Sequence, residues 1–185
     1  MTAFVALLRA VNVGGTGIIR MSDLKAICEK LGFEDVKTLL QSGNVAFKAR
    51  GADAAVARKL ADAIEKSHGF RPAVMVRTAD EIADAMKRNP FGAEARSNPA
   101  FLVVAFMAEQ PKAGADERLE AVKKAAGERL HLSGRELFAY FPIGQGKSKV
   151  TNAILERALG VPATARNWNT VGKLLALARE REAAK

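Results

Sequence analysis

The chain has 185 residues, of which 49% are hydrophobic, and it carries a formal net charge of +9. This composition can build a real core and excludes wholesale disorder, and the length suits one domain or two small ones packed as a unit. No apolar run approaches the roughly 18 residues of a membrane helix. A single cysteine, Cys28, excludes an internal disulfide framework and fits a reducing compartment. Residues 4–8 are followed at once by Arg9, without a basic leader or a small-residue cleavage site, so we expect no signal peptide and a cytoplasmic protein.

Hydrophobic patterns divide the first half of the chain into strands and helices. Residues 3–11 are apolar without alternation, which predicts a strand buried on both faces. Ser22 is a good N-cap for a helix that ends at Gly32, and Thr78 with Glu81 has the capping-box spacing of a later helix. The predicted strands are 3–11, 36–41, 44–48 and 73–77, and the predicted helices are 22–31, 53–67 and 78–89.

The second half repeats this order of elements. The predicted strands are 101–107, 128–132, 136–141 and 162–166, and the helices are 115–126, 148–160 and a last one from Trp168. Each half therefore contains a β-α-β-β-α-β unit, the ferredoxin-like arrangement, followed by an extra helix. We predict an α+β fold built as a tandem duplication, with a first half at 1–90, a linker at 91–99 and a second half at 100–185, packed as one compact unit.

The positive charge is concentrated at the two ends of the chain. The first 50 residues hold seven basic and four acidic side chains, and residues 143–185 hold eight and three. Such a distribution suits an anionic partner, either nucleic acid or a phosphorylated metabolite, although ordinary solubilising charge remains the alternative.

The loop that precedes the helix at 148 has the composition of an anion site. Glycines beside Lys147, Ser148 and Lys149 allow backbone N–H groups to converge at a helix start, whereas a flexible turn capped by Ser148 is the alternative. A nucleotide-binding P-loop is excluded, because Phe141 stands where its first glycine is required.

Three polar side chains are predicted to point inward. Arg9 stands near the end of a strand that is apolar on both faces, so it needs a carboxylate or a ligand anion. Thr151 and Arg157 fall within or beside the apolar arc of the helix from 149, which favours a lined cleft or a buried polar network. Structural ion pairing is the alternative for the two arginines.

The residues needed for metal or nucleophilic chemistry are scarce. Cys28 belongs to an apolar helix stripe, and the two histidines have no grouped carboxylates, so we expect no metal site, no cofactor and no Cys-His pair. The strand 136–141 partly resembles the aromatic signature of an RNA-recognition sheet, with Phe138 and Tyr140 on one face. Whether the protein is an enzyme stays open.

Three blocks of the sequence resemble a bacterial family, domain of unknown function 1697. They are Leu7-Leu8-Arg9-Ala-Val-Asn12-Val-Gly14-Gly15, Gln41-Ser42-Gly43-Asn44-Val45, and the segment 146–171, which includes Arg166-Asn167-Trp168. The resemblance spans about residues 3 to 178 and implies a duplicated α+β fold. It implies no activity, cofactor or catalytic residue.

These blocks coincide with the basic ends of the chain and define a candidate ligand site at the junction of the two halves. Its residues are Arg9, Asn12, Gln41, Ser42, Asn44, Lys147, Ser148, Lys149, Thr151, Arg157, Arg166 and Asn167. Hydrogen-bonding groups without a base beside a nucleophile suit recognition better than catalysis, so we expect an anion-binding protein, with nucleic acid ahead of a phosphorylated metabolite. The alternatives are an enzyme acting on a small anionic substrate and an interaction module in which these residues only join the halves. We expect no membrane partner, and the oligomeric state is left open.

Overall fold

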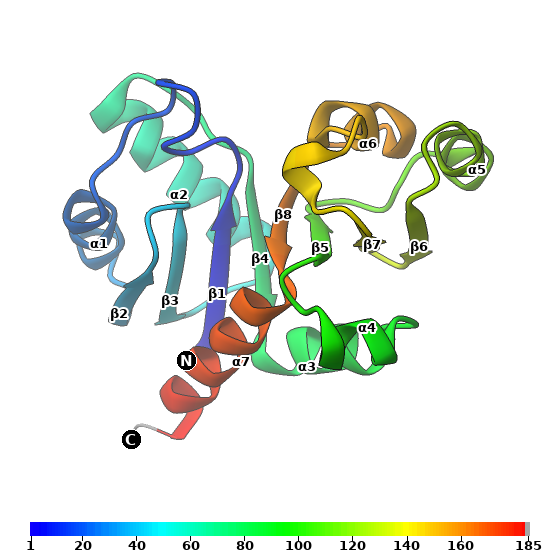
Figure 1. The fold of residues 1–185 in the computed structure, drawn as a ribbon. Helices are drawn as coiled ribbons and strands as arrows, with labels where there is room; N and C mark the ends of the chain where they lie inside the picture. Colours follow the sequence, from blue (N-terminus) through cyan, green and yellow to red (C-terminus); the bar gives the residue numbers. More distant parts are fainter. Residues whose placement is uncertain (184–185) are drawn as a thin grey trace. The chain divides into compact units, whose positions relative to one another are not determined.

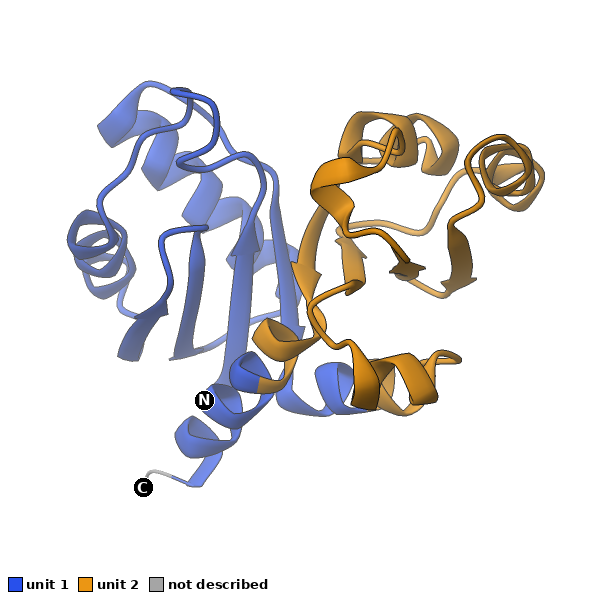
Figure 2. Ribbon diagram, in the orientation of Figure 1, with its two compact units in different colours: residues 1–83, 173–185 blue, residues 84–172 orange. Residues whose placement is uncertain are grey.

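The computed structural model describes residues 1–183, which form an α+β fold with two four-stranded antiparallel sheets (Figure 1). The predicted α+β class is therefore confirmed. The chain divides into two compact units, unit 1 with residues 1–83 and the chain from Lys173 onward, and unit 2 with Asp84–Gly172 (Figure 2). These divisions fall inside two helices, α3 (Ala79–Lys87) and α7 (Trp168–Ala183), whereas the sequence analysis placed its boundaries on either side of 91–99.

Unit 1 contains one sheet with the strand order β2-β3-β1-β4, in which each neighbouring pair is antiparallel. Its elements before α3 are β1 (Thr2–Leu8), α1 (Met21–Lys30), β2 (Glu34–Leu39), β3 (Asn44–Ala49), α2 (Asp53–His68) and β4 (Val74–Thr78). Strand β1 was predicted to continue to residue 11. It ends at Leu8, because Ala10 and Asn12 adopt left-handed φ angles of 55° and 56° that a strand cannot contain.

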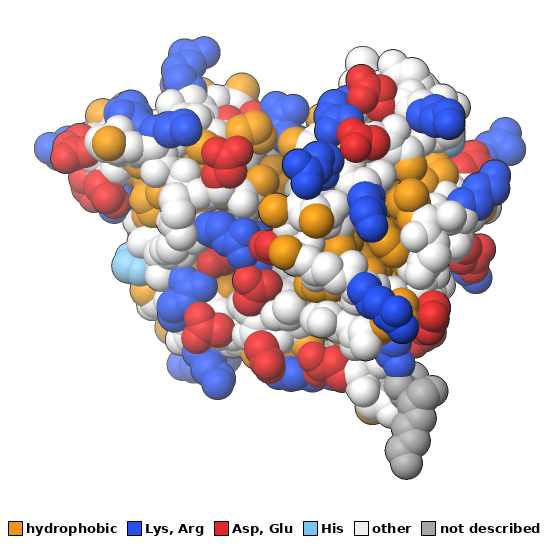
Figure 3. Space-filling view, turned by 180° about the vertical axis from the view of Figure 1, so that it is seen from behind, with side chains coloured by type: hydrophobic (Ala, Val, Ile, Leu, Met, Phe, Trp, Pro, Cys, Tyr) orange, Lys and Arg blue, Asp and Glu red, His pale blue; other side chains and the backbone are white. Residues whose placement is uncertain are grey.

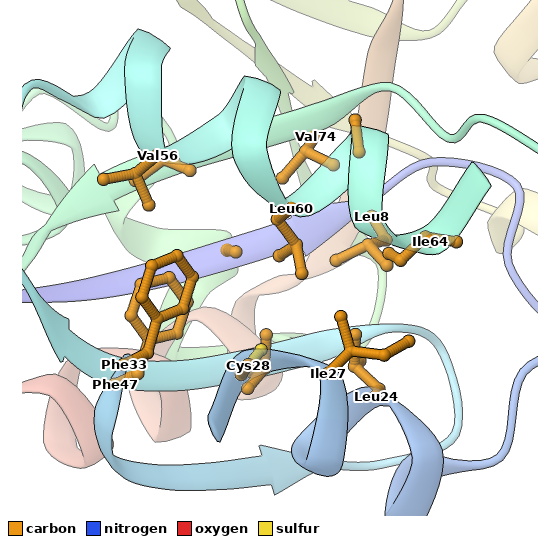
Figure 4. Close-up of a cluster of buried hydrophobic side chains, with 14 of the residues drawn as sticks. Leu8, Leu24, Ile27, Cys28, Phe33, Phe47, Val56, Leu60, Ile64 and Val74 are labelled. Carbon is orange, nitrogen blue, oxygen red and sulfur yellow. The ribbon is translucent and has the colours of Figure 1, made fainter. Parts of the chain in front are cut away.

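Helices α1 and α2 cover one face of this sheet and enclose a hydrophobic core (Figure 4). The strands contribute alternate residues to it, and Phe33 stacks on Phe47 with ring centroids 4.5 Å apart. Its members from the helices are Leu24, Ile27 and Cys28 of α1 and Val56, Leu60, Ala61 and Ile64 of α2. The spacing of three and four residues that predicted these helices thus corresponds to the buried side of each one.

The other side of β1 is buried as well. Ala3, Val5 and Leu7 alternate with the core residues and are at most 3% exposed. The strand lies between β3 and β4 at the centre of the sheet. The prediction of a strand buried on both faces is confirmed, and its unbroken apolar composition is explained by this position.

Cys28 is fully buried in the core of unit 1. Burial, with a smaller contribution from the charge of Glu29, raises the pKa of the thiol from 9.0 to about 12. Because the thiolate is the reactive form, Cys28 cannot act as a nucleophile near neutral pH. Its predicted role as a core residue is confirmed.

We expect Cys28 to resist a thiol reagent such as 5,5′-dithiobis(2-nitrobenzoate) near pH 8 in the folded protein and to react quickly in urea. Fast labelling of the native protein would contradict the burial.

The folded chain holds the thiol proton of Cys28 more tightly than the unfolded chain does. The stability that Cys28 contributes through this proton is therefore complete below the unfolded pKa of 9.0 and is lost as the pH rises toward about 12. Between pH 9 and 12, a Cys28→Ala variant should therefore lose less stability than the parent protein.

Helix caps were predicted at the starts of α1 and α3, and the structure shows one of them. The residue before α1 is Arg20, whose side chain makes no capping hydrogen bond, and Ser22 lies inside the first turn, so the predicted Ser22 cap is wrong. At α3 the capping box is confirmed, because the Glu81 N–H donates to Thr78 Oγ1 at 3.1 Å and the Thr78 N–H donates to Glu81 Oε2 at 2.8 Å.

Unit 2 has the strand order β6-β7-β5-β8, again with antiparallel neighbours. Its elements are α4 (Gly92–Ser97), β5 (Leu102–Met107), α5 (Ala115–Ala126), β6 (Arg129–Ser133), β7 (Glu136–Tyr140), a 3₁₀ turn at Gln145–Lys147, α6 (Asn152–Leu159) and β8 (Ala163–Asn167), before α7. Its core joins alternate residues of the strands to Leu119 of α5 and to Leu155, Ala158 and Leu159 of α6.

Helix α4 lies within the predicted linker at 91–99. Phe91, at its start, is 6% exposed, and the Arg129 guanidinium lies 4.7 Å from the centre of its ring. Glu94 forms an ion pair with the same arginine. Backbone hydrogen bonding at Glu94, followed by the hydrogen bond from Arg129, lowers the pKa of the glutamate. The segment is therefore held to β6 by contacts distant in the sequence, which a local composition of Asn, Pro and Gly does not reveal.

Within residues 1–183, no helix has the length and apolar character that crossing a lipid bilayer requires.

Candidate functional site

The loop after β1 and the turn between β2 and β3 hold the candidate residues of the first half, all in unit 1. The two segments touch through the backbone, since the Leu8 N–H donates to the Gly43 carbonyl at 2.8 Å. A Cβ atom at Gly43 would lie 2.9 Å from the Cβ of Leu8, and φ at this position is +74°. Only glycine allows the turn to approach β1 this closely.

Asn12 joins the loop to this turn through its side-chain amide. Its Nδ2 donates to the carbonyls of Ile19 at 2.9 Å and Gln41 at 2.8 Å, and its Oδ1 accepts the Ile19 N–H at 3.0 Å. Both amide hydrogens are therefore used by the backbone. Asparagine also tolerates the left-handed φ of 56° found here. The amide of Asn12 thus determines the course of residues 12–19.

The other candidates of the first half fall into two groups. Asn44 is completely buried, and its Nδ2 donates to the Leu39 carbonyl at 2.9 Å and to Ser42 Oγ at 3.0 Å, which closes the turn. Gln41 has an exposed side chain and Arg9 a half-buried one. Arg9 follows β1 instead of lying within it, and its N–H donates to the Ala73 carbonyl at 2.9 Å.

The loop between β7 and α6 holds most candidates of the second half, within unit 2. The Ser148 hydroxyl donates to the Glu128 carboxylate and accepts the Val150 N–H at 2.9 Å. Lys147 and Lys149, on either side of this fixed serine, are exposed. Ser148 was predicted to begin the helix. It follows a 3₁₀ turn instead, and α6 begins four residues later, after Thr151.

Thr151 and Arg157 are exposed, so the prediction that they point inward is wrong. Thr151 precedes α6, and its hydroxyl caps the helix by accepting the Ile154 N–H at 3.3 Å. Arg157 lies about 200° around the helix from the buried Leu155, since each residue turns an α-helix by about 100°. The predicted arc placed it at the edge because the arc included Ala153, which is exposed, and Val150, which precedes α6.

Glu128 is a buried residue of this region that the sequence analysis missed. Its side chain is 7% exposed, and its Oε2 has no hydrogen-bond partner among the described residues. A signal for it exists, because Glu128, Leu130 and Leu132 follow the period of two that places strand residues on one face. A buried carboxylate that fixes Ser148 makes the conformation of this loop depend on Glu128.

Arg166 and Asn167 lie at the end of β8. Arg166 is 8% exposed, and its Nη1 donates to Thr164 Oγ1 and to the Ala165 carbonyl, both at 2.8 Å. Burial lowers the pKa of its guanidinium from 12.5 to about 10. Asn167 caps α7, because its Oδ1 accepts the Thr170 N–H at 2.9 Å.

Unit 1 has a matching arginine that the sequence analysis did not select. Arg77 occupies the fourth position of β4, as Arg166 does in β8, and it is 1% exposed. Its Nη1 also donates to the preceding carbonyl, that of Val76, at 3.0 Å. In both units the buried arginine comes one residue before a capping residue, Thr78 or Asn167, and this repeated pattern could have identified it.

The structure places five of the twelve candidates in unit 1 and seven in unit 2. The prediction that they form a single site at the junction of the halves stays a prediction. The aromatic pair that partly resembles an RNA-recognition sheet does not form an open stacking face, because Phe138 is completely buried and Tyr140 is half-buried. On the face drawn in Figure 3, basic and acidic side chains are interspersed instead of forming one basic field. Among residues 1–183, no three His, Cys, Asp or Glu side chains gather as a metal site would require.

Two antiparallel sheets of four strands, each with its own helix-covered core, define an α+β protein of two similar units. Over residues 1–138 the sequence matches the family described as a protein of unknown function, DUF1697, and the chain belongs to this family. The match ends in β7, so the block 146–171, which also carries the resemblance, lies outside it.

A solved structure has a similar fold along nearly the whole chain. The conserved bacterial protein SP0830 from Streptococcus pneumoniae matches with a TM-score of 0.68 and 21% sequence identity, covering 96% of this chain and 98% of that one. At this identity the similarity concerns the fold alone. The comparison with curated proteins finds no match.

Proposed function

We propose that the protein binds a small phosphorylated molecule at the loop 144–153 of unit 2. The observation that carries the proposal is the pair of exposed lysines, Lys147 and Lys149, on either side of the fixed Ser148. Neither lysine takes part in an ion pair within residues 1–183. Two lysines separated by one residue and without a carboxylate partner attract a multiply charged anion such as a phosphate ester.

The backbone of the same loop supplies hydrogen-bond donors. Thr151 caps the N–H of Ile154, whereas the N–H groups of Asn152 and Ala153 lie in the first turn of α6, where no preceding carbonyl can accept them. The partial positive charge of a helix start adds to that of the lysines. Gly144, with φ of +84°, allows the chain to turn sharply between β7 and this loop.

A small molecule is favoured over nucleic acid as the ligand. Single-stranded nucleic acids are bound by aromatic side chains that stack on bases, and Phe138 of β7 is not available for this because it is completely buried. Duplex binding needs an extended basic surface, and on the face drawn in Figure 3 basic and acidic side chains are mixed. The exposed lysines of the loop suit one phosphate or diphosphate group.

The proposal predicts a local response to a phosphate-bearing probe. In a ¹H–¹⁵N NMR titration with inorganic pyrophosphate at low salt, the amide shifts should change mainly at residues 144–153. The double variant Lys147→Gln/Lys149→Gln should weaken binding by about tenfold or more, a loss of about 1.4 kcal/mol. Pyrophosphate is the simplest probe of the predicted charge pair.

A matched double variant, Lys123→Gln/Lys124→Gln, removes the same charge from the last turn of α5. It should leave the affinity nearly unchanged, because neither lysine belongs to the loop and Lys123 is already paired with Glu120. Equal losses in both double variants, or a short single-stranded DNA that binds this loop more tightly than pyrophosphate, would contradict the proposal.

We also infer that the two units arose by duplication of a ferredoxin-like β-α-β-β-α-β unit followed by an extra helix. The same strand order in both sheets supports this inference, counting β5 to β8 as the equivalents of β1 to β4. The equivalent registers of the buried arginines support it too, since Arg77 lies opposite Val5 of β1 and Arg166 opposite Val104 of β5.

A further inference from the structure

Unit 1 contains a pocket of about 240 Å³ where α1 ends and β2 begins. The residues of interest around it are Leu31, Gly32, Phe33, Glu34, Arg50 and Lys59. Gly32, with φ of +78°, ends α1 and turns the chain toward β2. Phe33 then enters the core, where its stacking on Phe47 gives the pocket a rigid apolar wall.

Two cations line this pocket without a carboxylate partner. Arg50 follows β3, and Lys59 lies on the exposed side of α2. Neither forms an ion pair within the part of the chain that the structure describes. Elsewhere in unit 1, Arg71 and Arg179 each contact two carboxylates. Unpaired cations beside an apolar wall match a ligand that joins an anionic group to an apolar body.

Glu34 brings a carboxylate to the same pocket because β2 is irregular at this point. The pairing with β3 shifts register between Glu34 and Lys37, and Asp35 between them has a left-handed φ of 50°. Arg181 of α7, 5% exposed, donates through Nε to the Asp35 carbonyl at 3.0 Å and so holds the irregular segment. Bulges of this kind re-aim side chains and occur next to functional sites.

We propose that this pocket binds a small organic acid whose apolar body also carries a hydrogen-bond donor. The anionic group lies between Arg50 and Lys59, the apolar body packs against Leu31 and Phe33, and the donor meets the Glu34 carboxylate. Sites for drug-sized molecules measure roughly 300–1,000 Å³, so a pocket of this size suits a single ring or a short chain. The site uses none of the residues of the loop 144–153.

The probe 4-hydroxyphenylacetate has the three required groups, a carboxylate, a ring and a hydroxyl donor. In an NMR titration it should shift the amides of residues 31–34, 50 and 59. The double variant Arg50→Gln/Lys59→Gln should lower its affinity about tenfold or more. Tyramine has the same ring and hydroxyl but a cationic amine in place of the carboxylate, and it should not perturb these amides.

The matched control is Arg58→Gln/Lys66→Gln, which removes one arginine and one lysine from exposed positions of α2 outside the pocket. It should keep the parent affinity, and so should Lys147→Gln/Lys149→Gln, which separates this proposal from the one on unit 2. In Glu34→Gln, the preference for 4-hydroxyphenylacetate over phenylacetate should fall several-fold. No shift at residues 31–34 with either acid, equal losses in both double variants of unit 1, or equal binding of tyramine would overturn the proposal.

Discussion

Replacing Asn12 with alanine should lower the free energy of unfolding of unit 1 by about 3 kcal/mol. The substitution removes three hydrogen bonds, and the two to Ile19 involve a residue that is 2% exposed, so its backbone groups lose their partner where water is scarce. These losses account for about 2 kcal/mol. Alanine in a left-handed conformation, with φ near 56°, adds about 1 kcal/mol.

A short series of variants separates the two contributions. Asn12→Gly loses the hydrogen bonds but accepts the backbone conformation, so it should cost about 2 kcal/mol. Asn12→Asp keeps the acceptor for the Ile19 N–H but sets a carboxylate oxygen against the Ile19 and Gln41 carbonyls, so its cost should equal or exceed that of alanine. Native-state hydrogen exchange of the amides in β1 and β3 measures the effect in unit 1. A loss below about 1 kcal/mol for Asn12→Ala would show that the amide is not essential to the loop.

The order of elements and the cores could be predicted because both depend on periodicity. Leu24, Ile27, Cys28 and Leu31 recur at helix spacing, and all but Leu31 are buried. The unbroken apolar run of β1 corresponds to its place at the centre of a sheet. A periodic pattern remains recognisable even when its ends are misplaced. The predicted elements therefore match those of the structure, although several of their first or last residues differ.

The predicted ends of strands and helices differ from the observed ones where a few backbone angles determine where an element stops or starts. Strand β1 stops at two left-handed residues, Ala10 and Asn12, and neither is a glycine that would have marked the turn. A 3₁₀ turn at Gln145–Lys147 precedes α6, so the helix begins at Asn152 and not near Ser148. Such angles are set by contacts with residues distant in the sequence, which a local pattern does not contain.

The candidate site was harder to predict than the fold. Polar residues of a loop, such as Asn12 and Asn44, have the same composition whether they bind a ligand or the backbone, and the structure shows them bonded to backbone carbonyls. The pocket of unit 1 gave no signal, because Arg50 and Lys59 come from different elements and meet only in the folded chain. Glu128 is the exception, since its place in an alternating strand pattern was readable.

Replacing Arg88 with alanine should destabilise unit 2 by about 3 kcal/mol, the lower end of the range for breaking a buried ion pair. Arg88 follows α3, and its Nη2 donates to Glu136 Oε2 at 2.7 Å. Its Nη1 donates to the carbonyl and the hydroxyl of Ser133 at 2.8 and 2.6 Å. Although burial opposes its charge, hydrogen bonds to Glu136 and Asp84 hold the pKa of Arg88 above its ordinary value.

Most of the expected loss of stability comes from Glu136, the buried partner of Arg88. Glu136 is 4% exposed, so the alanine variant breaks its ion pair with Arg88 in a region of low dielectric constant. Arg88→Lys should recover only part of the stability, because one ammonium group cannot reach Glu136, the Ser133 carbonyl and Asp84 in the geometry of a guanidinium. The hairpin of β6 and β7, which contains both partners, should show the largest loss of hydrogen-exchange protection.

Two further variants test this assignment. Asp84, the second carboxylate partner of Arg88, has a side chain that is 64% exposed. Asp84→Ala should therefore lower the free energy of unfolding by less than about 0.5 kcal/mol. In the double variant Arg88→Ala/Glu136→Gln the buried carboxylate no longer needs a cation, so its loss should fall short of the sum of the single losses by about 1–3 kcal/mol. Strictly additive losses, or an Asp84→Ala variant as unstable as Arg88→Ala, would mean that the buried pair is not what fixes the end of α3 to this hairpin.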